Sequence, residues 1–243
     1  MQGLKSTKKE DKEILIIIPA YNEAESIGDV ISSIKKTLSH VDILVVNDGS
    51  TDDTAKIAME LDATVINHPF NLGIGATMQT GYKFAYSKGY NIAVQVDADG
   101  QHPPEEVKSL LQPLEKKISD AVVGSRFLGQ GDYKPSLVRG IGMLVFSKII
   151  STIIRERSTD TTSGFRAVNK DVIKFYVNNY PEDYPEVEAL VLLHKAGFKV
   201  IETPVTMNAR TGGVSSITFL RAVYYMIKVL LAVFVDLLKK VDR

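Results

Sequence analysis

Runs of apolar, largely β-branched residues alternate with helix-type patterns along the first half of this 243-residue chain, and this alternation limits the fold more than any other feature. The predicted strands are Ile14–Ile18, Val41–Val46, Ala63–Asn67, the run that ends before Asp97, and Asp120–Gly124. Continuous apolar runs are typical of strands buried on both faces. Strands that alternate with helices fold through right-handed crossovers into a doubly wound, mostly parallel sheet, so the expected fold class is α/β.

Helix signals fill the intervals between these strands. Apolar residues at helical spacing run from Ile27 to Leu38, Thr51-Asp52-Asp53 can cap a helix to about Leu61, and Asn71-Leu72-Gly73-Ile74-Gly75 leads into a helix that ends near Gly89. Pro103 and Pro104 begin another helix, because proline is favoured in a first turn. The second half is less regular, and its predicted elements are helices over Pro135–Arg155, Lys170–Asn178 and Val187–Ala196, a loop over Asp160–Arg166, and a strand over Phe198–Met207 that Pro204 interrupts.

Polar side chains stand directly after four of the predicted strands. These residues are Tyr21 and Glu23, Asn47 and Asp48, Asp97 and Asp99, and Arg126. In open α/β sheets, ligands bind outside the carboxyl ends of the strands. The pattern therefore predicts that these side chains share one site.

The most specific part of that site is the segment Asp97-Ala98-Asp99-Gly100-Gln101. Residues two apart in an extended backbone point to the same face, so Asp97 and Asp99 should converge at a strand mouth, with Gln101 close enough to add an oxygen. Such oxygens suit a hard divalent cation, Mg²⁺ or Mn²⁺, with positions left open for phosphate oxygens. The plainer alternative is that both aspartates only end a strand, since aspartate is common in turns.

Composition excludes several other classes of function. Lysine plus arginine and aspartate plus glutamate each number 29, so no field of one sign indicates a nucleic-acid partner. Cysteine is absent, which excludes a disulfide framework, a thiolate zinc site and a cysteine nucleophile, and fits a cytoplasmic location. Residues 1–13 are expected to be a polar lead-in, since they lack the apolar core of a signal peptide.

The C-terminal segment, residues 217–243, is predicted to form an amphipathic helix. Arg221, Lys228, Asp236 and Lys239 fall on one narrow stripe and leave a broad apolar face. These charges argue against a membrane-spanning helix, which needs about 20 nearly uncharged residues. The apolar face is expected to pack on the domain, on a second copy in a homo-oligomer, or in the interface of the cytoplasmic membrane face.

The chain resembles glycosyltransferase family 2, a family with the GT-A fold, and within it the dolichyl-phosphate mannosyltransferase-like branch that glycosylates polyprenyl phosphates. The resemblance covers roughly residues 14–217, with a GT-A domain expected over residues 14–216. Seven short motifs in order carry it, namely Pro19-Ala20-Tyr21-Asn22-Glu23, Val46-Asn47-Asp48-Gly49-Ser50-Thr51-Asp52, Asn71-Leu72-Gly73, Asp97-Ala98-Asp99-Gly100-Gln101-His102-Pro103-Pro104, Gly124-Ser125-Arg126-Phe127, Ser163-Gly164-Phe165-Arg166 and Arg210-Thr211-Gly212-Gly213-Val214-Ser215-Ser216.

The resemblance implies an inverting hexosyl transfer from a nucleotide sugar, a UDP- or GDP-hexose, with Mg²⁺ or Mn²⁺. Asp97, Asp99 and Gln101 would hold the metal ion, and Arg126 and Arg210 would reach the diphosphate or the incoming phosphate. Pro19, Tyr21 and Glu23 would border the base and ribose, and Asp48 would contact the nucleoside. The other donor-binding residues expected are Ala20, Asn47, Gly73 and Ala98.

The acceptor is left open between a lipid phosphate and a glycan hydroxyl in polysaccharide synthesis. A hydroxyl needs a carboxylate to take its proton, whereas a polyprenyl phosphate is already ionised. Glu186 is the candidate residue on the acceptor side, either as a base or only as part of a helix start that follows Pro185. His102 and His194 are expected to be a turn residue and a helix-surface residue.

Three other functions fit the sequence less well than glycosyl transfer. A subunit that binds a nucleotide sugar without turnover is disfavoured because Asp97, Asp99, Gln101, Arg126 and Arg210 are all present. A nicotinamide-dependent oxidoreductase is disfavoured because no complete glycine-rich fingerprint follows the first strand. A nucleotidyltransferase is disfavoured because the glycine-rich basic loop expected there is also missing.

Overall fold

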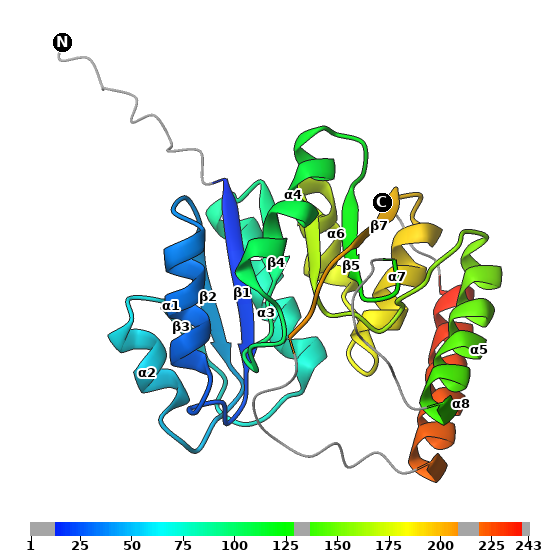
Figure 1. Cartoon of the computed structure of the whole chain (residues 1–243), viewed down its shortest axis with the longest axis horizontal. Helices are drawn as coiled ribbons and strands as arrows, with labels where there is room; N and C mark the ends of the chain where they lie inside the picture. The colour runs from blue at the N-terminus through cyan, green and yellow to red at the C-terminus, as the bar shows by residue number, and fades with distance from the viewer. Residues whose placement is uncertain (1–12, 129–136, 209–218, 240–243) are drawn as a thin grey trace.

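A three-layer α/β/α sandwich forms the body of the protein (Figure 1). The computed structural model describes residues 13–128, 137–208 and 219–239. The predicted lead-in up to residue 12 lies outside the described residues, as do Arg210 and the rest of its motif.

One seven-stranded sheet forms the middle layer, in the order β3-β2-β1-β4-β6-β5-β7. All its neighbouring strands are parallel except at β6, which is antiparallel to both β4 and β5. The mostly parallel α/β sheet expected from the sequence is therefore confirmed. The strands are β1 (Ile14–Ala20), β2 (Asp42–Asn47), β3 (Thr64–Asn67), β4 (Ile92–Gln95), β5 (Ala121–Ser125), β6 (Arg166–Asn169) and β7 (Val200–Pro204).

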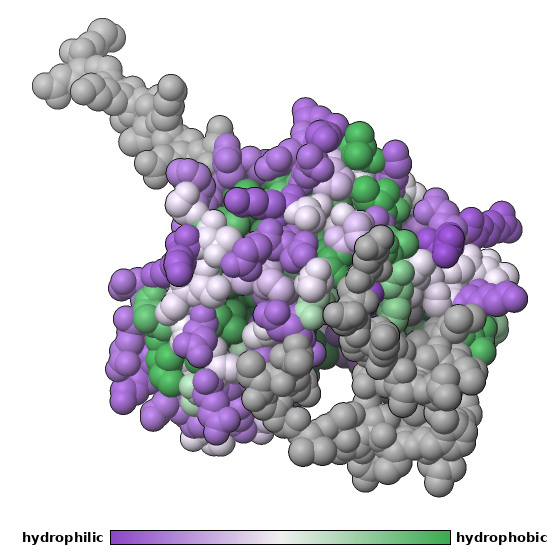
Figure 2. Space-filling model, in the orientation of Figure 1, coloured by the Kyte–Doolittle hydropathy of each residue, from purple (hydrophilic) through white to green (hydrophobic). Residues whose placement is uncertain are grey.

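Helices cover both faces of the sheet. They are α1 (Ile27–Thr37), α2 (Thr54–Glu60), α3 (Ile74–Lys88), the 3₁₀ turn η1 (Pro104–Glu106), α4 (Val107–Glu115), α5 (Leu137–Ile154), α6 (Lys170–Asn179), α7 (Pro185–Lys195) and α8 (Phe219–Leu238). Strand β1 shows why helices pack on both faces of the sheet, because its apolar side chains point to both. Leu15 and Ile17 join the apolar core under α3, α6 and α7, while Ile16 and Ile18 join the core under α1, α2 and α4. On the face that Figure 2 shows, hydrophilic side chains cover much of the described surface, with apolar ones in small groups.

The structure corrects the sequence prediction at β6. The segment Asp160–Arg166 was expected to be a loop, but Arg166 is the first residue of a strand that inserts between β4 and β5. Its register pairs Arg166 with Gln95 and with Val123. The strand is short and begins with a buried arginine, so it lacks the apolar run that marked its neighbours. As a result, the carboxyl ends of β4 and β5 are separated by one strand.

Helices α8 and α5 both contact α7 (Figure 1). Val229 and Val233 of α8 are fully buried in the core cluster, so part of the apolar face does pack on the domain. The expected charged stripe is only partly correct, because Asp236 is buried whereas Lys228 is exposed. Among the described residues, no helix combines the length and the apolar character needed to cross a bilayer.

Candidate active site

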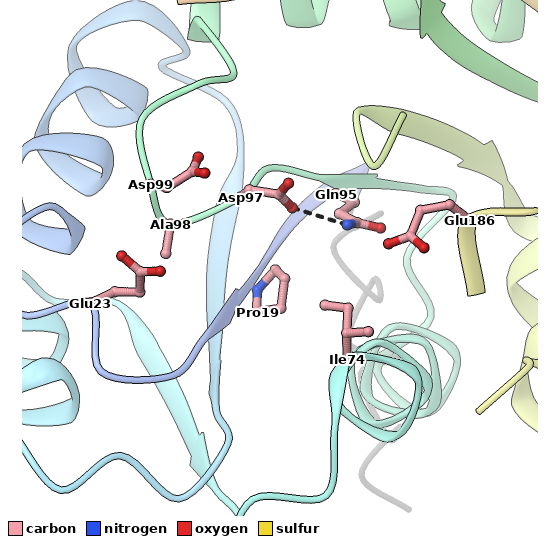
Figure 3. A pocket seen from close by; sticks show the side chains of 8 residues that line it. All are labelled: Pro19, Glu23, Ile74, Gln95, Asp97, Ala98, Asp99 and Glu186. Carbon is pink, nitrogen blue, oxygen red and sulfur yellow. Dashed lines mark hydrogen bonds between the residues drawn. The ribbon is translucent and has the colours of Figure 1, made fainter. Parts of the chain in front are cut away.

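A cavity of about 170 Å³ lies at the carboxyl ends of β1 and β4, which run parallel. Figure 3 shows Glu23 and Asp99 at one end of this pocket, Glu186 at the other, and Asp97 with Gln95 between them. The pocket brings together six predicted site residues and two that the sequence analysis did not select. Its walls are Pro19, Glu23, Ile74, Gln95, Asp97, Ala98, Asp99 and Glu186.

The loop after β4 delivers both predicted metal-binding carboxylates. Val96 continues the sheet through a hydrogen bond from its N–H to the carbonyl of Ile17, so Asp97 stands directly at the strand mouth. Gln95 Nε2 donates to Asp97 Oδ1 over 3.0 Å, and the N–H of Gln101 donates to Asp99 Oδ1 over 3.1 Å. Gln101 is not among the residues that line the pocket, so the structure does not place all three predicted ligands on one wall.

The oxygen donors of this pocket fit a hard divalent cation that also binds a ligand's oxygens. Among the described residues, those that line the cavity include four carboxylates and no cationic side chain. Yet the described part of the chain contains no group of three His, Cys, Asp or Glu side chains arranged to hold a metal ion. Asp97 and Asp99 would therefore supply only part of a coordination shell, and a bound diphosphate would supply more of it.

Glu186 reaches the pocket from the first turn of α7. Burial raises its pKa above the ordinary value; the positive charge of Arg166 opposes this, and the negative charge of Asp97 adds to it.

The position of α7 depends on Gly75, at the start of α3. A Cβ there would lie only 2.3 Å from the carbonyl oxygen of Glu182, so only glycine lets these two segments approach so closely.

Asn47, Asp48 and Gly73 do not line the pocket. Their hydrogen bonds instead connect the loops beside it. Asp48 is buried and accepts hydrogen bonds from the N–H groups of Leu72 and Gly73, both over 2.9 Å, and from His68 Nδ1 over 2.7 Å. Although burial opposes ionisation, these hydrogen bonds together lower the pKa of Asp48. The carboxylate thus fixes the loop that leads into α3.

Asn47 performs a similar task beside it. Its Nδ2 donates to Asn67 Oδ1 over 2.9 Å, and its Oδ1 accepts the N–H of Ser50 over 3.3 Å. These hydrogen bonds join the ends of β2 and β3 to the turn that follows Asp48. Asn47 and Asp48 therefore shape one border of the site from behind its surface.

The predicted base-binding segment comprises the end of β1 and the loop that follows it. Pro19 and Glu23 line the cavity, Tyr21 is 47% exposed, and Ala20 is buried. Asn22 adopts a positive φ of 54°, and its Oδ1 accepts the N–H of Thr51 over 2.8 Å. The loops after β1 and β2 are therefore bound to each other.

Arg126 is held by a buried aspartate outside the pocket. Its Nε and Nη2 each lie 2.7 Å from a carboxylate oxygen of Asp160, which is 1% exposed. Glu202 on β7 fixes the same segment by accepting hydrogen bonds from the N–H groups of Thr159 and Asp160. The two hydrogen bonds from Arg126 to Asp160 orient the guanidinium. Asp160 was not predicted from the sequence as a partner of Arg126.

Gln95, Ile74 and His102 are the residues at or behind the pocket that sequence reasoning missed. Gln95 could have been found, because it is the one polar residue in the run Ile92–Val96 and stands two positions before Asp97, on the same face. Ile74 gave no signal beyond its place at a helix start. His102 is buried and bonded to Asp97, rather than being only a turn residue.

Solved structures share this fold. Glucosyl-3-phosphoglycerate synthase from Mycobacterium tuberculosis, crystallised with Mg²⁺ and UDP, superposes with a TM-score of 0.70 and 22% sequence identity. The match covers 90% of this chain and 78% of that one. The architecture is therefore the GT-A fold of glycosyltransferases.

Sequence comparison identifies the family. Residues 15–176 match Glycosyl transferase family 2. A UDP-N-acetylglucosamine–dolichyl-phosphate N-acetylglucosaminyltransferase of Methanococcus voltae is 34% identical over 215 residues, which cover 80% of this chain and 85% of that protein. A polyprenol monophosphomannose synthase of Mycolicibacterium smegmatis is 31% identical over 226 residues, which cover 88% and 84%. The chain belongs to glycosyl transferase family 2 and is a glycosyltransferase.

Proposed function

We propose that this glycosyltransferase moves a hexose from a nucleoside-diphosphate sugar to a polyprenyl phosphate, with inversion at the anomeric carbon and a divalent metal ion at Asp97 and Asp99. The observation that carries the proposal is the charge of the pocket. Four carboxylates line it and none of its described walls is cationic, so an anionic diphosphate would be repelled unless a cation bound with it. The lipid-phosphate acceptor is supported by the activities named for the two relatives.

Different walls of the pocket are proposed to contact different parts of the donor. Glu23 and Pro19, from the same segment as Tyr21, are proposed to border the nucleoside, and Asp97 and Asp99 to hold the metal-bound diphosphate. A divalent cation held there would offset the charge that grows on the departing diphosphate. Glu186, which lies at the end of the pocket away from Glu23 and Asp99, is the proposed contact for hydroxyl groups of the sugar.

The transfer itself needs no protein base when the acceptor is a phosphate. An acceptor phosphate oxygen forms a bond to the anomeric carbon while the bond from that carbon to the diphosphate breaks, and the electron pair leaves with the diphosphate. No proton moves. Arg126, oriented by Asp160, is the proposed contact for one of the phosphate groups, and Arg210, outside the described residues, is proposed as a second.

A bilayer surface is the proposed meeting place with such an acceptor. Leu231, Phe234, Val235 and Leu238 on α8 are between 52% and 71% exposed. Their spacing of i, i+3, i+4 and i+7 places them on one side of the helix, opposite the buried Val229 and Val233. This apolar side suits the interface of a membrane, and a second copy of the chain is the alternative partner.

The direct test combines ligand binding with turnover. The protein is mixed with UDP- and GDP-hexoses, with and without Mn²⁺, and its thermal unfolding is followed. A ligand at 100 times its dissociation constant should add about 2.7 kcal/mol of stability. Transfer to dolichyl phosphate is then assayed by the appearance of the glycosylated lipid. We expect the lipid product only with a divalent metal.

Asp99→Ala should remove the metal dependence of the donor-induced stabilisation, whereas Asp29→Ala, at an exposed position on α1, should keep it. Transfer that proceeds unchanged in excess chelator would contradict the metal-dependent mechanism. Transfer to a glycan hydroxyl and not to a lipid phosphate would contradict the proposed acceptor.

A further inference from the structure

The imidazole of His102 lies directly behind the Asp97 carboxylate. Its Nδ1 accepts a hydrogen bond from the backbone N–H of Asp97 over 3.0 Å. Because Nδ1 accepts, a neutral ring carries its proton on Nε2, and that atom lies 3.7 Å from Asp97 Oδ2. One side chain therefore contacts both the backbone and the carboxylate of the same residue.

The local sequence fixes this ring in place. Gly100 has a φ of +76°, which lets the chain reverse between Asp97 and His102. Pro103 restricts the backbone of His102 to extended conformations. The ring itself is 5% exposed and stacks on the buried Phe165, with centroids 4.6 Å apart and an angle of 12° between the planes.

The other oxygen of Asp97 is held from a different element. Gln95 Nε2 donates to Oδ1 over 3.0 Å, and Gly164, next to Phe165, leaves the space that both side chains occupy. Gln95 therefore hydrogen-bonds one carboxylate oxygen, and His102 Nε2 lies near the other, beyond hydrogen-bond distance, while the side chain of Asp97 is 36% exposed and lines the pocket. Groups that hold a metal ligand in this way tune its affinity for the ion.

We infer that His102 is a positioning residue that fixes the backbone and the carboxylate of Asp97 for metal binding. The inference rests on the proposed function, because the position of Asp97 matters only if Asp97 binds the proposed metal ion. The hydrogen bond to the Asp97 N–H is the contact that carries it, since it is the shorter of the two and sets the rotation of the peptide that bears Asp97.

Two substitutions separate positioning from simple packing. His102→Asn places an amide oxygen as many bonds from the backbone as Nδ1, so it can still accept the Asp97 N–H, but it loses the stacking on Phe165. His102→Phe keeps the stacking ring and loses both nitrogen atoms. If His102 serves only in packing, His102→Phe should keep more of the Asp97 amide protection and Mn²⁺ affinity than His102→Asn. If His102 positions Asp97, His102→Asn should keep more of both. His40→Phe, at an exposed histidine, is the matched control.

The first readout is amide hydrogen exchange at Asp97, which needs no metal. We expect protection at that amide in the wild type and in His102→Asn, and faster exchange in His102→Phe. Equal protection in all three proteins would overturn the inference.

The second readout is Mn²⁺ binding by electron paramagnetic resonance. We expect His102→Phe to bind about tenfold more weakly or worse, with His102→Asn close to the wild type. Wild-type affinity in His102→Phe would overturn the inference while leaving the metal site standing. If instead the wild type binds Mn²⁺ no better than Asp97→Asn, the proposed metal site fails, and hydrogen exchange still decides the positioning of Asp97.

Discussion

Glu186 and Asp97 line the same pocket, and the negative charge of Asp97 adds to the burial that raises the pKa of Glu186. Glu186→Gln removes one charge and any capacity to take a proton, while the side chain keeps its size. With a polyprenyl phosphate as acceptor we expect kcat to fall by less than about tenfold, because no base is required; loss of a needed general base would cost about 10²–10⁴-fold. The measurement is kcat with dolichyl phosphate and the donor that the binding panel selects.

Glu182→Gln, at an exposed position before α7, is the matched control and should leave kcat unchanged. A drop beyond a hundredfold in Glu186→Gln would show that the acceptor needs deprotonation, and it would favour a hydroxyl acceptor. A rise in KM for the donor with little change in kcat would fit contact with the sugar.

Gly164 offers a test of how closely the site is packed. A Cβ at this position would lie 2.8 Å from Gln95 Nε2 and 3.2 Å from Asp97 Oδ2, so Gly164→Ala must displace one of these side chains. We expect kcat/KM to fall by about 10–100-fold, since small misplacements at a reacting centre have effects of that size. Steady-state kinetics with the donor varied would measure the change.

Gly28→Ala provides the comparison for that variant. Its Cβ would lie 3.4 Å from Ile57 Cγ2, an ordinary contact, within helix α1. Alanine there should leave activity unchanged and add up to about 1 kcal/mol of stability, because alanine is the better helix former. If Gly164→Ala retains full activity, Asp97 and Gln95 tolerate displacement and the packing argument is wrong.

A buried pair of acidic side chains, Glu188 and Asp236, lies between α7 and α8. Burial, followed by a hydrogen bond with Asp236, raises the pKa of Glu188 to about 7. Asp236 is 1% exposed, and its Oδ1 lies 2.6 Å from Lys239 Nζ. Its Oδ2 is buried and can accept a hydrogen bond from Glu188 when Glu188 is protonated. Asp183 adds further negative charge to this contact, and Lys195 binds the last carbonyl groups of α8.

A pH dependence of stability follows from this pair. The folded protein retains the Glu188 proton up to about pH 7, whereas the unfolded chain loses it near the ordinary value of 4.5. The stabilisation is therefore complete below pH 4.5 and is lost as the pH rises to about 7, by up to about 3 kcal/mol. Urea unfolding at pH 5, 6, 7 and 8 should show this slope, and Glu188→Gln should flatten it.

Asp183→Asn removes only the smallest of these contributions, from an exposed side chain, so it should reduce the slope slightly and leave most of it in the same series. An identical slope in Glu188→Gln would show that another group sets the pH dependence. Because Glu186 lies on the first turn of the same helix, the pair also connects the C-terminal helix to the pocket wall.

The elements differ in how far their residues predict them. Strands β1, β2, β4 and β5 were recovered because each is buried on both faces and therefore reads as an apolar run. Strand β6 was missed because Arg166, its first residue, is buried through hydrogen bonds to the carbonyls of Ser163 and Thr161. Such partners depend on tertiary structure. The site shows the same limit, since Asp97 and Asp99 follow from spacing, but the pairing of Arg126 with Asp160 joins residues 34 positions apart.

At the scale of the whole molecule, the middle of the sheet and the C-terminal helix serve different purposes. The central strands β1 and β4 carry the pocket, while α7 contributes Glu186 to that pocket and also packs against α5 and α8 (Figure 1). One side of α8 exposes apolar residues, and its other side belongs to the domain core. Deleting the helix would therefore remove Val229 and Val233 from the core, so that a loss of folding could not be separated from a loss of membrane binding. Substitution of the exposed side alone avoids this.

Replacing Leu231, Phe234 and Leu238 together by serine should weaken sedimentation with anionic phospholipid vesicles by about a hundredfold or more, because each side chain loses roughly 1–2 kcal/mol of burial in the bilayer. The matched control replaces Met59, Tyr86 and Ile118 by serine, since these are about equally exposed on other faces. Transfer to a short-chain prenyl phosphate dissolved in water should persist in the α8 variant, because the pocket is intact. Unchanged vesicle binding would contradict the membrane contact. A change in molar mass by light scattering, with vesicle binding unaltered, would instead assign this side of α8 to a second copy of the chain.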